Sequence, residues 1–370
     1  MQSFNIDTFL SEYWQKKPVV LKGFFTEFVD PIDENDLAGL AQESEIDSRV
    51  ISRKNNKWQV ETGPIADFEK ACQGQWTLLV QGVDKYIADV QPLLSPFSFI
   101  PHWRLDDLMV SFATQDAGVG AHIDQYDVFL IQGKGSRRWR VGEPGDYAEV
   151  LPHPKLRQIE GFSPIIDEVL MPGDVLYVPP GWPHDGMTIE DSLTYSVGYR
   201  APDNLQLAES LAMMLDKGFA NHRFSDPSRL AASSPAAVAS SDVKALKQQL
   251  IDAIQSDHFT QALLEAMSEQ GIPEFPLEQE VTIEQVSNDL ASGIGFQPAP
   301  GVRALLCDGK DGLPYALYVN GSRFDIGEND AEWYRLLASG ANFNATSCQD
   351  APSFAFLQTL ATLINNGYWE

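Results

Sequence analysis

Between residues 105 and 200 the sequence is a series of short apolar runs separated by glycine and proline. The runs are LMVSFA, VFLIQ, RWRVG, VLYVPP and LTYSVGY. Short runs at close intervals are typical of β-strands in a barrel or sandwich. The linkers show little helical periodicity, so parallel strands joined by crossover helices are disfavoured. We therefore expect a barrel whose strands pair mostly antiparallel.

The chain before this segment changes from helix to strand. An amphipathic pattern predicts a helix from about residue 6 to 15, and the β-branched run Val19-Val20-Leu21 predicts a strand that ends at Gly23. These elements precede the barrel and are assigned to the same domain, over residues 1–202.

A helical region follows, over residues 203–275. The apolar stripe of LQLAESLAMMLDKG is closed by Gly218, a second helix begins with Ser241 or Asp242 as N-cap, and a third stops near Gly271. A few helices form only a thin hydrophobic core by themselves. We therefore expect this region to form a homodimer with a second copy of the chain, although packing on the chain's own barrel would bury the same stripes.

Residues 276–370 show the order helix, strand, strand, turn and two helices, which resembles a winged helix. The Asn320-Gly321 pair predicts the hairpin turn. Winged helices often bind DNA, but residues 281–370 hold four basic and ten acidic residues. This excess of acid lacks the electrostatic footprint of a DNA reader. We therefore expect a protein contact or a structural role, with no direct DNA binding.

The charge of the whole chain constrains its partners. It has 52 acidic and 26 basic side chains and a formal net charge of −26. Such a surface repels nucleic-acid phosphates and anionic lipid and favours a basic macromolecule. The sequence has no apolar run near the length of about 18 residues that spans a membrane and no signal-like start. Its three cysteines lack metal-like spacing, which fits a cytoplasmic protein whose metal ligands would be histidine and carboxylate.

Two histidines and one aspartate have the pattern of a metal site. His122 and Asp124 are separated by one residue, so on a strand both side chains project to the same face. His184 follows another apolar strand and a rigid PPGWP turn. Two histidines and one carboxylate can bind one side of a metal and leave three positions open, as in non-haem Fe(II) oxygenases. A structural histidine is the more common role of either motif alone, but their combination favours a metal triad. The same ligands also suit Zn²⁺ or Mn²⁺.

The strand after the HxD motif carries an arginine that should face the interior. Period-two alternation places Arg137 on the same face as Trp139 and Val141. A buried guanidinium needs an anion. That anion is either a protein carboxylate, such as Asp124 or Asp174, or the carboxylate of an organic cosubstrate whose other end chelates the metal. A keto acid would suit both ends.

These motifs carry a family resemblance. HID (122–124), Arg137 on the next strand and GDVLYVPPGWPH up to His184 resemble the JmjC-type cupin dioxygenases, which use Fe(II), 2-oxoglutarate and O2. The resemblance implies a mainly β protein with α-helices: a double-stranded β-helix barrel, a helical dimerisation region and a winged-helix-like C-terminal domain. It implies that His122, Asp124 and His184 bind iron and that Arg137 anchors the distal carboxylate of 2-oxoglutarate. Thr194 and Ser196 match positions that line this pocket. No catalytic residue beyond the metal centre is expected.

Within that family, the chain resembles the bacterial ribosomal oxygenases that hydroxylate an arginine of large-subunit ribosomal protein L16 (uL16). The matching segments are WQKKPVVLKG, RLDDLMVSF, QYDVFLIQGKGSRRWRVG and YSVGYRAP, and the resemblance is loosest over 220–300. An arginine substrate requires an acidic or amide group in the pocket. The candidates are Asp106, chosen over Asp107 because only one of the two can face the barrel, and Asp116; Gln125 and Tyr126 are expected to border the same cleft.

Two other functions remain compatible with these residues. One is a metal-binding cupin without turnover, which acts as a scaffold; it would have no need for an interior Arg137. The other is a 2-oxoglutarate oxygenase of another protein or of a small molecule, against which stand the chain's size and acidity. The remaining histidines, His102, His153, His222 and His258, are interpreted as structural or surface residues.

Overall fold

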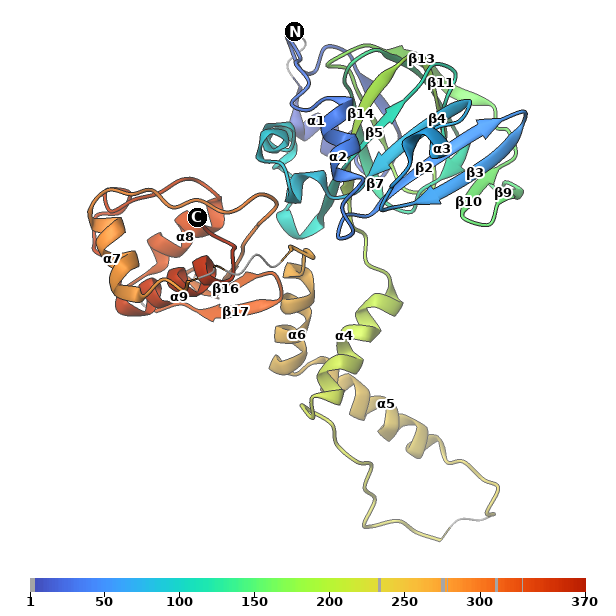
Figure 1. The fold of residues 1–370 in the computed structure, drawn as a ribbon. Helices are drawn as coiled ribbons and strands as arrows, with labels where there is room; N and C mark the ends of the chain where they lie inside the picture. The colour runs from blue at the N-terminus through green and yellow to red at the C-terminus, as the bar shows by residue number, and fades with distance from the viewer. Residues whose placement is uncertain (1–3, 232–233, 274–276, 278, 310–311, 328) are drawn as a thin grey trace. The chain divides into compact units, whose positions relative to one another are not determined.

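The computed structural model describes residues 4–231, 234–273, 277, 279–309, 312–327 and 329–370. The chain divides into two compact units (Figure 1). The first comprises residues 1–201 with 299–301, and the second residues 202–298 with 302–370. Among the described residues, no helix combines the length and the apolar character needed to span a membrane.

The first unit is built on two antiparallel sheets and a hairpin. The eight-stranded sheet has the order β1-β12-β7-β14-β5-β4-β2-β3, the four-stranded sheet the order β11-β8-β13-β6, and β9 pairs with β10. The strands are β1 (Val19–Leu21), β2 (Ser48–Lys54), β3 (Lys57–Thr62), β4 (Gln75–Val80), β5 (Leu105–Ala113), β6 (His122–Ile123), β7 (Asp127–Gln132), β8 (Ser136–Gly142), β9 (Glu149–His153), β10 (Leu156–Ile159), β11 (Pro164–Leu170), β12 (Val175–Val178), β13 (Pro183–Glu190) and β14 (Ser192–Tyr199). All these pairs are antiparallel, as the sequence predicts.

Short helices accompany these sheets. They are α1 (Ile6–Glu12), α2 (Glu34–Leu40), α3 (Phe68–Ala71) and the 3-10 turns η1 (Val83–Lys85), η2 (Ala88–Leu93), η3 (Ser95–Phe97) and η4 (His102–Arg104). The first helix ends at Glu12, before the expected Gln15, which has a positive φ of 56° that no α-helix contains. Phe9 of α1 packs on Phe129 and Tyr177 of the large sheet, with ring centroids 5.5 and 4.9 Å apart.

The central strands of the large sheet are buried on both faces. On β7, Phe129 and Ile131 join the core beneath the helices, whereas Val128 and Leu130 pack with Trp139 of β8 between the two sheets. Each such side chain contributes roughly 1.5–3 kcal/mol of burial free energy. These two cores fix the register of the strands, because a slip by one residue would exchange their faces.

Strand β14 has two chemically different faces. Leu193, Tyr195 and Val197 belong to the helix-covered core. Thr194 and Ser196 alternate with them, are almost fully buried and line a cavity between the sheets. The interior of the barrel therefore combines an apolar core with a polar wall.

The second unit contains helices and a small sheet. Its elements are α4 (Asn204–Asp216), α5 (Ser240–Ile254), α6 (Asp257–Ser268), α7 (Ile283–Ala291), β15 (Leu305–Asp308), β16 (Pro314–Val319), β17 (Ser322–Asp325), α8 (Ala331–Ser339) and α9 (Phe354–Asn365). The helices and antiparallel strands after α6 confirm the predicted winged-helix-like order. Asn320 and Gly321 both have positive φ, at 43° and 80°, which matches a two-residue hairpin turn.

Two helix boundaries differ from the expectation. Helix α5 begins at Ser240 with Ala239 as its N-cap and no capping side chain, so Ser241 and Asp242 lie in its first turn. Helix α6 ends at Ser268, whose hydroxyl donates to the Glu265 carbonyl at 2.8 Å, before Gly271 is reached. Small shifts of this kind are common at helix ends, which fray.

Candidate metal centre

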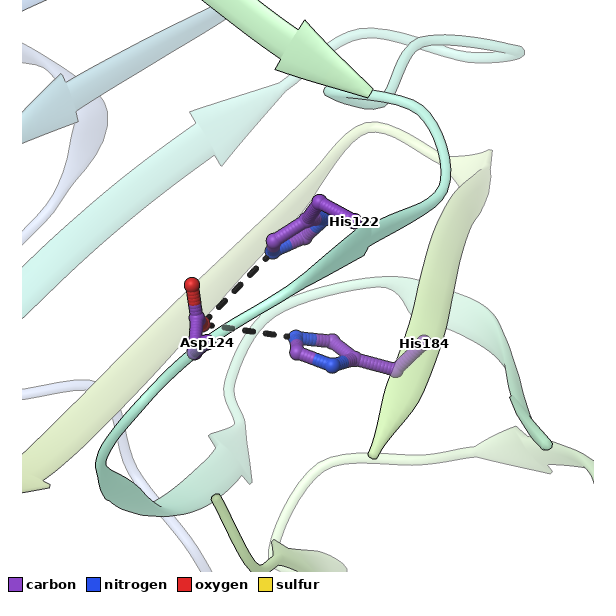
Figure 2. A group of neighbouring side chains, drawn as sticks. All are labelled: His122, Asp124 and His184. Atoms are coloured by element: carbon purple, nitrogen blue, oxygen red, sulfur yellow. Dashed lines mark ion pairs between the residues drawn. The ribbon is translucent and has the colours of Figure 1, made fainter. Parts of the chain in front are cut away.

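Two paired strands bring the histidines of the barrel together. In the register of β6 and β13, His122 lies directly opposite His184. Asp124 follows the end of β6, and its carbonyl accepts a hydrogen bond of 2.8 Å from the Gly181 amide in the PPGWP turn. The turn that the sequence marks as rigid is thus tied to the HxD segment, and the three side chains converge (Figure 2).

Hydrogen bonds to the backbone orient both imidazole rings. Nδ1 of His122 lies 2.9 Å from the Gly120 carbonyl, and Nδ1 of His184 lies 3.0 Å from the Trp182 carbonyl. Because a carbonyl only accepts, each Nδ1 carries the proton and each Nε2 keeps its lone pair. These Nε2 atoms lie 3.7 and 3.6 Å from Oδ2 of Asp124. Figure 2 shows all three side chains directed at one point.

The donor set fits a divalent metal. One donor atom from each of His122, Asp124 and His184 lies within 4.8 Å of the others. His184 is only 2% exposed, and burial lowers its pKa to about 4, with the neighbouring His122 adding to the effect. It is therefore neutral at physiological pH, the form that binds a metal. Two imidazoles and one carboxylate on one side suit a metal with open positions.

Arg137 points into the same interior and is 3% exposed. Its Nη1 donates to Thr194 Oγ1 at 3.4 Å, and its Nη2 donates to the Gly186 carbonyl at 3.2 Å. The guanidinium lies over the Trp139 ring, 4.7 Å from its centroid. Its Nε has no hydrogen-bond partner among the described residues. The alternation that the sequence predicts for β8 is confirmed.

Arg137 has no carboxylate partner in the part of the chain that the structure describes. Asp174 pairs instead with Lys22, at 3.1 Å, and Asp185 pairs with Arg140. Asp124 faces the two histidines. Burial lowers the pKa of Arg137 to about 10, and the field of Asp185 opposes this shift only in part. A charged, buried and unpaired guanidinium is the complement of a bound anion.

One cavity of about 450 Å³ contains the three predicted metal ligands and Arg137. Thr194 and Ser196 line it from β14, and Ser111 lines it from β5, where it pairs in register with Thr194. The end of the cavity where Arg137 lies over the Trp139 ring is called the deep end below. The structure therefore brings the predicted cosubstrate residues and the predicted metal ligands into one space.

The mouth of this cavity adjoins a second hollow of about 290 Å³, with Tyr126 and Ser196 shared between the two. Burial raises the pKa of Tyr126, the nearby Asp124 carboxylate raises it further, and Arg49 opposes the rise. Tyr126 thus borders the cleft, as expected. Gln125, by contrast, is exposed and does not line the metal cavity.

The preference for Asp106 over Asp107 as the barrel-facing acid is wrong. Leu105 and Leu108 both enter the same core, because the pairing of β5 with β14 shifts register between them. Asp106 is left with a 66% exposed side chain, 3.7 Å from Arg200. Asp107 is more buried and accepts a hydrogen bond of 2.7 Å from the Gly82 amide. Together with Met109 it lines the hollow beside the metal cavity. Burial raises the pKa of Asp107 to about 7, and Asp84 adds to the effect.

Asp116 lies away from the metal cavity, contrary to the expectation. It has a positive φ of 61° and lines a separate hollow of about 220 Å³ together with Arg140 and Asp185. Arg140 of β8 and Asp185 of β13 project from the face of the sheet opposite to the face from which Arg137 projects. Asp116 is therefore on the outer side of the sheet that carries the metal ligands.

Several polar residues of the cavity wall were not predicted from the sequence. Arg49 of β2, Thr77 of β4 and Lys155 of the β9–β10 connection all line the metal cavity. Period-two alternation groups Arg49 with Ile51, but it does not reveal that β2 joins the barrel sheet through β4. Of the other histidines, His258 stacks on Phe219 with centroids 4.6 Å apart, consistent with a structural role.

Comparison with known proteins adds independent findings. The family model for the JmjC domain matches residues 92–207, and that for the ROXA-like winged helix matches residues 240–370. The ribosomal protein uL16 3-hydroxylase of Escherichia coli (strain K12) is 40% identical over 99% of this chain and 98% of its own length.

Solved structures agree with these matches. The X-ray structure of E. coli ycfD has a TM-score of 0.93 and 38% identity, covering 100% of this chain and 99% of that one. A structure of the E. coli ribosomal oxygenase in complex with cobalt and 2-oxoglutarate has a TM-score of 0.89 and 38% identity, covering 100% and 98%. The likeness thus extends over both compact units.

Proposed function

The chain belongs to the family of JmjC-domain ribosomal oxygenases, and on that basis we propose that it is an Fe(II)- and 2-oxoglutarate-dependent oxygenase that hydroxylates an arginine side chain of ribosomal protein uL16. One observation carries the proposal. The unpaired, buried Arg137 and the triad of His122, Asp124 and His184 line a single cavity. A dicarboxylate with a keto group at one end would satisfy both.

Each group of residues has a distinct task in this reaction. His122, Asp124 and His184 would hold Fe(II) and leave three positions for cosubstrate and O2. Bound iron, 2-oxoglutarate and O2 together supply the oxidising chemistry, which yields succinate, CO2 and one oxygen atom for the substrate C–H bond. Arg137 would bind the distal carboxylate through charge-assisted hydrogen bonds, and Thr194 and Ser196 supply hydroxyls beside it.

The mouth of the cavity suits a guanidinium. Asp107 and Tyr126 line the adjoining hollow, as does Asp106, whose side chain is the more exposed of the two carboxylates. We propose that Asp107 orients the substrate arginine, because an ionised carboxylate accepts two parallel N–H bonds from a guanidinium. The substrate cation in turn would favour the ionised form of Asp107.

The charge of the chain supports a basic polypeptide as substrate. The relative from E. coli acts on uL16, and a net charge of −26 attracts a basic protein at moderate ionic strength. Such a substrate also implies a cytoplasmic enzyme. A non-catalytic scaffold would bind no anion at Arg137. The buried guanidinium without a carboxylate partner therefore disfavours a scaffold role.

We propose a homodimer formed by the helices of residues 203–275. Helices α4 and α5 expose apolar side chains that a second copy would cover, among them Leu205, Met213, Leu246, Leu250 and Ile254. Replacement of Leu246 and Leu250 by Asp should convert a dimer to a monomer in multi-angle light scattering. A monomeric wild-type chain would overturn the assignment. For residues 276–370, the acidic excess supports a protein contact over DNA binding.

Reconstitution tests the activity directly. The protein is loaded with Fe(II) without oxygen and then mixed with O2, 2-oxoglutarate and intact uL16. We expect a mass increase of one oxygen atom on an arginine of uL16, with an equal amount of succinate. Succinate formation without modification of uL16 would refute the substrate, and modification without 2-oxoglutarate would refute the mechanism.

A further inference from the structure

One wall of the metal cavity carries cations that the reaction described above does not use. Arg49 projects from β2 into the cavity and is partly buried. Among the described residues, the Arg49 guanidinium has neither a hydrogen-bond partner nor a carboxylate within 4.0 Å. By contrast, Arg53 on the same strand lies over the Trp58 ring, 5.3 Å from its centroid, and lines a different hollow.

A second cation lies close to Arg49 on another segment. Lys155, between β9 and β10, lines the cavity, and its Nζ donates to Thr62 Oγ1 at 3.1 Å. Thr62 is the residue of β3 that pairs in register with Arg49. Among the described residues, the ammonium therefore has only this neutral hydroxyl as a hydrogen-bond partner and no carboxylate within 4.0 Å. Arg157 adds a third cation to this wall, although it also lies 3.5 Å from Glu149.

The same wall contains an unused hydroxyl. Thr77 of β4 is completely buried, lines the cavity and has no hydrogen-bond partner for its Oγ1 among the described residues. Its register partner on β2 is Ile51, two residues from Arg49. A buried hydroxyl without a partner costs free energy unless a ligand or water satisfies it. Arg49, Lys155 and Thr77 therefore surround a place that suits a carboxylate.

Charge is segregated around the cavity. Apart from the predicted metal ligand Asp124, no acidic residue in the described part of the chain lines the metal cavity, whereas the adjoining hollow carries Asp106 and Asp107 together with Lys85. The rest of the protein is strongly negative. A dianionic cosubstrate that approaches this protein is repelled until it meets a local positive potential, and a cleft lined by one sign of charge focuses that potential.

We propose that Arg49 and Lys155, with the Thr77 hydroxyl, form an anion-binding subsite that draws the dicarboxylate cosubstrate into the cavity toward Arg137. The inference rests on the proposed function. Arg49 and Lys155 act here as positioning residues, since the final carboxylate contact belongs to Arg137. The basic polypeptide uses the acidic hollow instead, so the two substrates approach over surfaces of opposite charge.

The rate of 2-oxoglutarate association tests this subsite. Fe(II)-loaded protein without oxygen is mixed rapidly with 2-oxoglutarate, and the absorption of the iron–keto acid chelate is followed at several salt concentrations. The double variant Arg49→Gln with Lys155→Gln should associate about 10-fold more slowly at low salt. Its dependence on salt should be weaker than that of the wild type. Arg53→Gln removes the same charge from the same strand outside the cavity and should behave as the wild type.

Several results would overturn the subsite. One is an association rate and salt dependence of the folded double variant equal to those of Arg53→Gln, with folding verified by thermal denaturation. Another is an increase of the polypeptide KM alone, which would assign these cations to the protein substrate. If the wild type itself shows no chelate absorption, the proposed function fails as well. A normal wild-type signal with an unchanged variant rejects the subsite only.

Discussion

The deep end of the metal cavity and its mouth are built on different principles. At the deep end, Arg137 and Trp139 of β8 are almost fully buried, and the neighbouring Thr194 lies on β14, a strand that is buried along its whole length. At the mouth, Asp106 and Tyr126 are exposed, and the register of β5 against β14 shifts. Fixed side chains suit a cosubstrate that is the same in each turnover. Accessible side chains suit a polypeptide that must bind and leave.

The largest effect should follow from removal of a ligand at the deep end. His184→Ala takes away one of three metal donors, so we expect metal binding and hydroxylation to fall by more than the roughly 100-fold that outer-shell changes cause. Manganese(II) binding measured by electron paramagnetic resonance checks this. The exposed His222, replaced by Ala, is the control. Unchanged metal affinity in His184→Ala would break the assignment of the triad.

Arg137→Met should weaken cosubstrate binding next most strongly. Loss of one partner of a buried charge pair costs about 2–5 kcal/mol, so the dissociation constant of 2-oxoglutarate should rise at least roughly 30-fold. Without cosubstrate the variant should melt at a higher temperature than the wild type, because an unpaired buried charge has been removed.

Arg138→Met is the matched control for this change. Arg138 is the next residue of β8, with a side chain that is 53% exposed and an ion pair to Asp167. Exposed pairs of this kind contribute about 0–1 kcal/mol. Equal effects of the two substitutions on 2-oxoglutarate affinity, measured by calorimetry, would show that burial does not distinguish the two arginines.

Gly186→Ala should displace the clamp without touching the metal ligands. A Cβ at Gly186 would lie 2.7 Å from Arg137 Nε and 2.8 Å from the Trp139 ring, so the guanidinium or the ring must move. We expect an increase of about 10-fold in the KM for 2-oxoglutarate from such a misplacement. Gly161→Ala, where a Cβ has open space, should leave the KM unchanged. An unchanged KM in Gly186→Ala would show that the deep end is less rigid than its packing implies.

An effect no larger than that of Gly186→Ala is expected at the mouth, through Asp107. Its pKa of about 7 reflects burial and the nearby carboxyls of Asp84 and Asp106, partly offset by the Gly82 amide and by Lys85. Since the ionised form would bind the substrate guanidinium, the KM for uL16 should fall as the pH rises through about 7. Asp107→Asn should raise the KM roughly 10-fold and remove this dependence.

Whereas the affinity for uL16 should increase with pH, the contribution of Asp107 to the stability of the fold should decrease. The folded-state pKa of Asp107 is above its unfolded value, so its contribution to the free energy of unfolding is full at low pH and is lost as the pH rises through about 7. The melting temperature of Asp107→Asn relative to the wild type should therefore increase from about pH 4 to about pH 7 and then stay constant. A difference that is independent of pH would contradict the raised pKa.

The two ends also differ in how well the sequence predicts them. At the deep end, period-two alternation on β8 identifies Arg137 as an interior residue because Trp139 and Val141 fix the facing of the whole strand. The HxD spacing and the rigid turn likewise identify His122, Asp124 and His184, which the structure brings together. Strong local patterns suffice there, because the facing of one strand assigns each of its side chains to the interior or to the surface.

The mouth depends on features that no local pattern contains. The register shift between Leu105 and Leu108 leaves Asp107 more buried than Asp106, although both line the hollow beside the metal cavity. Arg49 and Lys155 reach the wall through pairing between β2 and β4 and through a hairpin far along the chain. Such long-range pairing and bulges follow from tertiary packing, which a single sequence does not reveal.

A crystal structure of the protein with manganese(II) and 2-oxoglutarate tests the central claim most directly. We predict that the metal lies between His122, Asp124 and His184, with the keto acid chelated to it. The distal carboxylate should lie within hydrogen-bond distance of the Arg137 guanidinium. A cosubstrate bound elsewhere, or an Arg137 that remains without a carboxylate in the complex, would contradict the account.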